Sequence, residues 1–130
     1  MYKFELTTDK HAFYKITDKV RQAVNESGVK EGICVVFCPH TTAAITINEN
    51  ADDDVQRDVN FALKKVFPRM AEFRHDEGNS DGHVKSSVIG ASETLIITDG
   101  KLLLGRWQDI YFAEFDPPRN RNFYVKIIQG

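Results

Sequence analysis

Three histidines stand among polar side chains that could together bind a metal ion. His40 ends an apolar run and is followed by Thr41, while His75 and His83 share the segment "RHDEGNSDGH" with several carboxylates. Imidazoles beside carboxylates are typical of divalent metal sites, and three histidines leave one coordination position open for water or substrate. Their spacing matches no zinc-finger or H-E-x-x-H pattern, so purely structural histidines are the alternative. His11 has no such neighbours and is predicted to lie on the surface.

Three consecutive aspartates, Asp52, Asp53 and Asp54, precede an apolar pattern of helical spacing. Carboxylates in the first turn of a helix are stabilised by its unpaired amides and its dipole, by roughly 0.3–1 kcal/mol each. That role explains most of the triplet. Capping needs only one or two carboxylates, however, and three adjacent ones repel each other. One of them could therefore serve a metal or a substrate cation.

Basic side chains near hydroxyls could bind phosphate. Lys85 is followed by two serines in "HVKSS", which suits phosphate binding at a helix start, although the glycine-rich cradle of a P-loop is missing. Arg119 and Arg121 follow two prolines in the turn "DPPRNR". They form either a solvated hairpin tip or an anion clamp that reaches a neighbouring subunit.

The composition indicates one folded domain. The chain has 130 residues, of which 42% are hydrophobic and 28% are charged with both signs present. Its net charge of -2 provides no basic field for nucleic acid or an anionic membrane. The N-terminal residues lack the apolar core of a signal peptide, and no run approaches the about 18 apolar residues of a membrane helix. We therefore expect a cytoplasmic protein with neither nucleic acid nor membrane as a partner.

The two cysteines are predicted to be reduced thiols in the core. Cys34 and Cys38 lie in the apolar run "GICVVFCPH", which is typical of a buried strand. Four residues along a strand span roughly 13 Å, too far for a disulfide or one shared tetrahedral metal. The sequence contains neither a G-x-S-x-G elbow nor a Cys-His pair, which are the patterns that would indicate nucleophilic catalysis.

Two helices are predicted from periodicity. The segment "ADDDVQRDVNFALKKVF" carries a continuous helical stripe that ends before Pro68. A shorter helix is predicted to begin at Thr17 or Asp18 as its cap and to end at Gly28. The polar stretch between residues 68 and 85 is expected to be a long loop, and such loops are usually functional or disordered.

Strand patterns surround these helices. The pair Asp99-Gly100 between two apolar runs predicts a tight hairpin, and Trp107 is expected in the core. The order of elements predicts an α+β single domain over residues 1–130, with a mainly antiparallel sheet packed with two helices. The uncovered face of that sheet would favour oligomerisation. The predicted strands are residues 2–8, 32–38 and 43–48, the two arms of the hairpin, "WQDIYFAEF" and "NFYVKIIQ".

Three long segments together resemble the YjbQ-like family, whose members have been called secondary thiamine-phosphate synthases. They are "HTTAAITINENADDDVQRDV", "RHDEGNSDGHVKSSVIG" and "DGKLLLGRWQDIYFAEFDPPR", and the similarity covers nearly the whole chain in the same order. The resemblance implies an α+β domain that forms a homotrimer, with polar pockets near subunit boundaries. It also implies a divalent metal ion, zinc or magnesium, held by histidines.

The resemblance assigns a role to each matching polar position. The implied metal ligands are His40, His75 and His83. The implied catalytic residues are His40, Glu49 and Asp54. The implied phosphate-binding residues are Thr41, Lys85 and Arg119. Thiamine-phosphate synthesis joins an aminopyrimidine diphosphate to a thiazole phosphate, so its site must neutralise phosphate charge and help pyrophosphate leave. A divalent metal with Lys85 and an arginine would do so electrostatically.

Three functions remain open at this point. The first is a small metal-dependent enzyme acting on phosphorylated metabolites, with thiamine phosphate formation as its specific reaction. The second is a metal-dependent hydrolase of another substrate, which needs the same histidines. The third is a non-catalytic ligand-binding or assembly module in which the histidines are structural. The expected partners are other copies of the chain and a phosphorylated small molecule.

Overall fold

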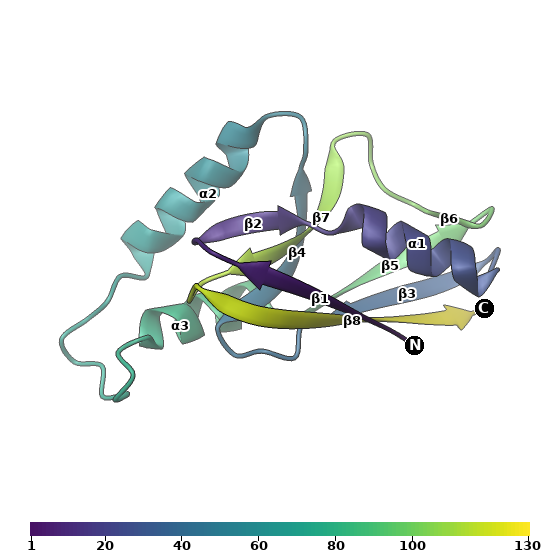
Figure 1. Cartoon of the computed structure of the whole chain (residues 1–130). Coiled ribbons are helices and arrows are strands. Elements are labelled where there is room, and N and C mark those ends of the chain that lie inside the picture. The colour runs from purple at the N-terminus through teal and green to yellow at the C-terminus, as the bar shows by residue number, and fades with distance from the viewer.

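The computed structural model describes residues 1–130 and contains two antiparallel sheets and three helices (Figure 1). The five-stranded sheet has the order β1-β8-β3-β5-β6, and the three-stranded sheet has the order β2-β7-β4. The predicted α+β class with antiparallel strands is confirmed. The strands are β1 (Tyr2–Thr8), β2 (Ala12–Lys15), β3 (Gly32–Phe37), β4 (Ala43–Glu49), β5 (Ser92–Thr98), β6 (Lys101–Leu102), β7 (Gln108–Glu114) and β8 (Arg119–Gln129). The helices are α1 (Thr17–Ser27), α2 (Asp53–Val66) and α3 (Ser80–Ile89).

Helix α1 covers the core side of the five-stranded sheet. It buries Val20 and Val24 against the alternating inward side chains of β3, β5 and β8, and it ends at Gly28 in the left-handed conformation, with φ 69°. The helix and its C-terminal stop are confirmed. The predicted cap is wrong, because Ile16 precedes the helix and the Thr17 hydroxyl instead accepts a hydrogen bond from the Ile110 amide in β7.

The predicted state of the cysteines is also confirmed. Cys34 and Cys38 are buried and unpaired. Burial raises the pKa of both thiols to about 11, so they stay protonated at neutral pH.

Helix α3 lies where the sequence predicted the end of a polar loop, so three helices are present rather than two. Its buried residues are Gly82, Lys85 and Ser86, which form no apolar stripe, and for this reason periodicity does not reveal it. Small side chains let the helix approach the strands closely. A Cβ atom on Gly82 would lie 2.9 Å from the Phe115 carbonyl oxygen, and Ser86 donates a hydrogen bond to the Ala43 carbonyl at 2.7 Å.

Two other details differ from the sequence analysis. The short edge strand β2 was not predicted, and it pairs with β7 to form a second sheet. Trp107 is not in the core: 54% of it is exposed, in the connection between β6 and β7, where the Arg106 guanidinium lies 4.8 Å from the ring centroid. The hairpin turn is confirmed, since Asp99 and Gly100 have φ angles of 51° and 74°.

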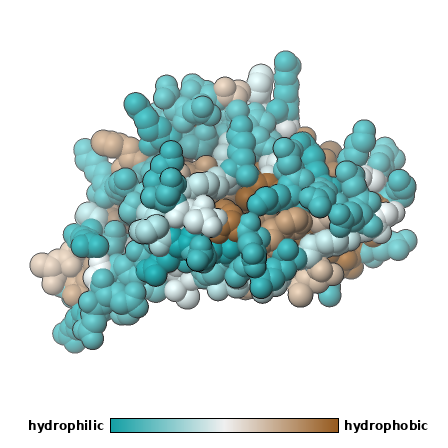
Figure 2. All heavy atoms as spheres, viewed as in Figure 1, coloured by the Kyte–Doolittle hydropathy of each residue, from teal (hydrophilic) through white to brown (hydrophobic).

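The surface is mostly hydrophilic in the view of Figure 2, and apolar atoms appear mainly near the middle of that face, between β1 and α1. None of the three helices has the length and apolarity needed to cross a membrane.

Candidate functional site

All three candidate metal-binding histidines line one pocket of about 500 Å³, which we call the histidine pocket. His40 comes from the turn between β3 and β4, His75 from the segment before α3, and His83 from α3. No hydrophobic side chain lines it. Its lining residues are Pro39, His40, Thr41, Thr42, His75, Glu77, Asn79, His83, Asp116, Arg119, Asn120 and Arg121. The predicted convergence of the two histidine segments is therefore present in the fold.

A buried ion pair forms the base of the histidine pocket. Arg121 of β8 donates from Nε and Nη2 to the two carboxylate oxygens of Glu114 in β7, at 2.8 and 2.5 Å. The Thr8 hydroxyl and the Asp116 amide also donate to this carboxylate, at 2.6 and 2.8 Å. Burial raises the pKa of Glu114, but the hydrogen bonds from Arg121, Thr8 and Asp116 outweigh it and hold the pKa below its usual range.

A second, more exposed pair lies at the mouth of the pocket. Arg119 donates to the Asp116 carboxylate at 2.8 Å, and the Asn79 side-chain amide donates to the same carboxylate at 2.7 Å. This fixes the orientation of the amide, because only its nitrogen can donate to a carboxylate. Asn79 Oδ1 is consequently buried without a hydrogen-bond partner. Such an orphaned acceptor would accept a donor or a cation from a bound ligand.

His40 is fixed by the backbone of β8. The Asn122 amide donates to His40 Nε2 at 2.8 Å, which requires that this nitrogen carry no proton. The neutral ring then carries its proton on Nδ1. Burial lowers the pKa of His40, and the Arg121 charge lowers it further.

We expect the His40 titration to show this environment. Its apparent pKa should lie below the ordinary value of about 6.5. The neutral ring therefore contributes to folding stability above about pH 6.5, and this contribution is lost as the pH falls through the lowered pKa. NMR titration of the imidazole Cε1–H signals, assigned with His40→Gln, would measure the pKa. A His40 pKa at or above that of a histidine in an unfolded peptide would contradict the geometry.

His75 and His83 lie close enough together that one metal ion could contact both. Their ring centroids are 5.3 Å apart with planes 89° apart. Two imidazoles on one tetrahedral zinc ion, with Zn–N bonds of about 2.0–2.1 Å, place their centroids roughly 5 Å apart. Glu77 lies beside them, with its carboxylate 3.8 Å from His75 Nε2.

His40 fits a metal less well than this pair. Its Nε2 lone pair is occupied by the Asn122 amide, and Nδ1 carries the proton of the neutral ring. In agreement, no group of three His, Cys, Asp or Glu side chains within the chain is arranged to hold a metal. The geometry thus fits a two-histidine site at His75 and His83, with other positions left for a ligand.

Comparison with known proteins identifies the family. The family described as "UPF0047 protein YjbQ-like" matches residues 2–130. This chain belongs to the YjbQ-like family. The UPF0047 protein MJ1081 of Methanocaldococcus jannaschii is 54% identical, over 98% of this chain and 94% of its own. UPF0047 protein YugU of Bacillus subtilis is 47% identical, over 94% and 93%.

Solved structures have the same YjbQ-like fold. An uncharacterized conserved protein of the family from Clostridium acetobutylicum has a TM-score of 0.96 and 55% identity, covering 98% of this chain and 100% of its own. A protein of unknown function from Sulfolobus solfataricus has a TM-score of 0.94 and 32% identity, covering 99% and 96%. The family and fold implied by the sequence resemblance are confirmed.

Three residues to which the YjbQ-like resemblance assigns roles lie outside the histidine pocket. Glu49 ends β4 while the pocket lies at the start of that strand, and six residue steps of roughly 3.4 Å separate these ends by about 20 Å. Asp54 lies near Glu49, in the first turn of α2. Lys85 is on α3, but its side chain is buried beside Asp81 at 3.6 Å. The pocket thus unites His40, Thr41, His75, His83 and Arg119.

No sequence pattern gave a role to Asn79, Asp116 or Glu114, although they hold this pocket together. One signal for Glu114 is available, since it is the charged residue within the apolar strand "IYFAEF" and a buried charge needs a partner. His11 is exposed, as predicted.

Proposed function

We propose that the histidine pocket binds phosphorylated small molecules and that the protein acts on them as a metal-dependent enzyme. The observation that carries this proposal is the lining: three histidines and two arginines surround one opening without any hydrophobic side chain. Such a lining suits a strongly hydrated, anionic group better than an apolar molecule.

Arg119 is the residue best placed to contact a phosphate. Its side chain is 46% exposed and pairs with Asp116 at 2.8 Å, so a ligand can exchange with that carboxylate. Arg121 is buried and committed to Glu114, so it positions the base of the pocket and stabilises negative charge from below. Neutral His40 can donate its Nδ1 proton to a ligand oxygen or to a leaving group.

A divalent ion would be held by His75 and His83, which line the same pocket. Such an ion supplies positive charge that stabilises a phosphoryl oxygen or a leaving pyrophosphate. Zinc is preferred to magnesium, because imidazole nitrogens suit zinc whereas magnesium requires oxygen ligands.

Thiamine phosphate formation is the specific reaction that the YjbQ-like resemblance implies. It would place two heterocycles close to the polar groups described above. A metal-dependent hydrolase is the second candidate, because the polar lining suits any substrate with a charged group and does not require a heterocycle. Both functions use Arg119 and the histidine pair in the same way.

The reaction can be tested directly. The protein, supplied with zinc, should form thiamine phosphate from the aminopyrimidine diphosphate and the thiazole phosphate, with Arg119→Ala slower and His11→Ala unchanged. Product is measured by chromatography against heat-inactivated protein. Absence of product with release of inorganic phosphate from either substrate would replace the synthase with the hydrolase. If neither thiamine phosphate nor inorganic phosphate is formed, the non-catalytic ligand-binding module is the function that remains.

We also propose that the protein forms a homotrimer. The outer face of the five-stranded sheet carries three exposed isoleucines in one row across neighbouring strands, because Ile33 pairs with both Ile96 and Ile128. They are 38%, 54% and 46% exposed, and a contiguous apolar row of this kind favours contact with another chain.

Light scattering coupled to gel filtration should therefore report about three times the chain mass of 14.8 kDa. Ile96→Lys should reduce that mass, because a charge within the row opposes burial of the face. Val66→Lys, on the exposed side of α2, serves as the matched control. A monomeric parent at micromolar concentration would exclude the trimer.

A further inference from the structure

A second pocket lies between α2 and the three-stranded sheet and shares no lining residue with the histidine pocket. Its outer groove measures about 620 Å³ and is lined by residues that include Lys10, Lys15, Arg57 and Tyr14. Its inner chamber measures about 120 Å³, and its lining includes Thr46, Asn48, Val59 and Ile89. Phe13, Gln56 and Tyr111 line both, so the two spaces adjoin. We call them together the α2 slot.

We propose that the α2 slot is a second ligand site, which takes one heteroaromatic ring carrying an acidic group. The inner chamber has the size of one ring, since an apolar cavity of about 150 Å³ in another protein binds benzene. Phe13 and Tyr111 stand edge to face in it, with centroids 6.4 Å apart and planes at 88°, beside Val59 and Ile89. These side chains provide apolar contact for a flat ring.

Polar groups in the inner chamber favour a ring with nitrogen or amino substituents over a hydrocarbon. Asn48 Oδ1 accepts from the Glu49 amide at 2.7 Å, and Gln56 Nε2 donates to the Glu49 carbonyl. The other ends of these side chains, the Asn48 amino group and Gln56 Oε1, make no hydrogen bond within the chain. One donor and one acceptor are thus available to the edge of a heteroaromatic ring.

Three cations in the lining of the outer groove could contact the acidic group. Lys10, Lys15 and Arg57 line it with one carboxylate, Asp53. The pairs made by these cations elsewhere are long: Lys15 lies 3.8 Å from Asp109, and Arg57 Nε lies 4.0 Å from two carboxylates of its own helix. Because the whole chain has a net charge of -2, this positive charge is local.

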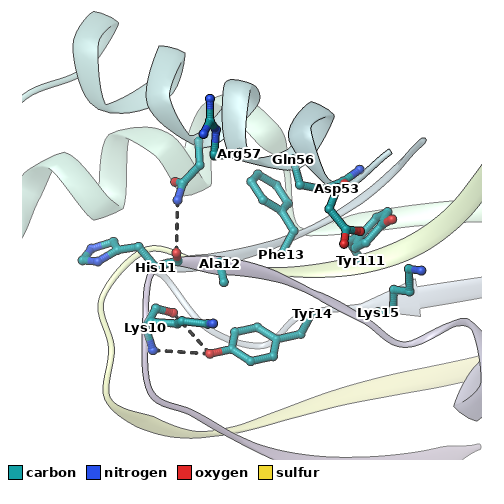
Figure 3. Close-up of a pocket in the computed structure, with 11 residues that line it drawn as sticks. Lys10, His11, Ala12, Phe13, Tyr14, Lys15, Asp53, Gln56, Arg57 and Tyr111 are labelled. Atoms are coloured by element: carbon teal, nitrogen blue, oxygen red, sulfur yellow. Dashed lines mark hydrogen bonds between the residues drawn. The ribbon is translucent and has the colours of Figure 1, made fainter. Parts of the chain in front are cut away.

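The walls of the α2 slot are held in place without a ligand. Figure 3 shows Phe13 pointing from β2 toward α2, where Gln56 lies beside it, with Asp53 and Tyr111 close together at one end. The Tyr111 hydroxyl donates to the Glu49 carbonyl at 2.7 Å, and the Tyr14 hydroxyl donates to Asp9 at 2.8 Å. Since α2 buries only Leu63 among its residues, the space beside it is not filled by its own side chains.

The ligand class can be tested with simple probes. Nicotinate and 3-pyridylmethyl phosphate combine the ring with a carboxylate or a phosphate, nicotinamide has the ring without charge, and inorganic phosphate has the charge without the ring. In ¹H–¹⁵N NMR spectra of the protein, both acidic ring compounds should shift amides of β2 and the first half of α2. The compound that binds more tightly shows whether the site prefers a carboxylate or a phosphate. Nicotinamide should bind more weakly, and inorganic phosphate should leave these amides unshifted.

Variants locate the ring and the charge separately. Val59→Phe places an aromatic ring in the chamber and should weaken nicotinate binding at least about tenfold, whereas Val66→Phe on the exposed side of α2 should not. The double variant Lys15→Gln/Arg57→Gln should weaken it roughly three- to thirtyfold, as expected for two exposed charge contacts, while Lys65→Gln should have no effect.

Three results would overturn the proposal. The first is that the ring compounds shift only amides of the histidine pocket. The second is that Val59→Phe binds nicotinate as tightly as the parent does. The third is that the α2 slot amides shift with protein concentration when no ligand is present. The last would mean that a second chain occupies the slot. Because the histidine pocket is tested with other residues, failure of either site leaves the other intact.

Discussion

Replacement of Arg121 by alanine should lower the free energy of unfolding by about 3–5 kcal/mol, because it leaves the Glu114 carboxylate buried without its main partner. Glu114 is 1% exposed, so its burial is compensated mainly by its hydrogen bonds, of which Arg121 donates two. Arg121 also donates to the Thr42 hydroxyl at 2.9 Å, and this contact between β8 and the start of β4 is lost as well. Urea unfolding followed by circular dichroism measures the change.

The matched control is Arg119→Ala. Arg119 also makes a short ion pair, at 2.8 Å with Asp116, but its side chain is 46% exposed, so its loss should have a much smaller effect. The double variant Arg121→Met/Glu114→Leu should recover most of the stability, because it removes both charges. If Arg121→Ala and Arg119→Ala unfold at the same urea concentration, the pair at the base of the pocket does not have the proposed role.

The same pair predicts a pH dependence. The pKa of Glu114 is held below its usual range, so its contribution to stability is present at neutral pH and is lost as the pH falls through that lowered pKa. In Arg121→Ala, burial raises the pKa of Glu114 without the opposing Arg121 contacts, so this loss of stability in acid should be smaller than in the parent or reversed, as urea unfolding at neutral and acid pH would measure.

The sequence predicts the fold where apolar periodicity is strong. Helix α1 buries Val20 and Val24 at helical spacing, and the strands alternate or form apolar runs, so their positions follow from burial. Helix α3 contacts the rest of the protein through Gly82 and Ser86 instead, and its packing depends on small size and a hydrogen bond that hydropathy does not encode.

The candidate site shows the same division. Imidazoles near carboxylates, together with the family resemblance, indicated that His40, His75 and His83 belong together. The path of the chain determines the rest: the connection of residues 115–118 brings Glu114 of β7 to Arg121 of β8, and Lys85 is turned away from the pocket by its position on α3. The direction of these side chains cannot be derived from spacing along the chain.

Removal of His75 or His83 should abolish tight zinc binding. With two protein ligands on one ion, loss of either should weaken zinc binding by more than about a hundredfold. This is more than the usual effect of changing a residue that contacts a ligand but not the metal itself. His40→Ala should have a much smaller effect, since its Nε2 already accepts the Asn122 amide.

The central claim, that His75 and His83 form the metal site of the histidine pocket, is tested most directly by calorimetric zinc titration of protein prepared without chelator or affinity tag. The parent and His11→Ala should each bind one zinc ion per chain, whereas His75→Ala and His83→Ala should not bind it tightly. If the parent binds no zinc, or if all of these proteins bind it equally, the metal site is not at this histidine pair.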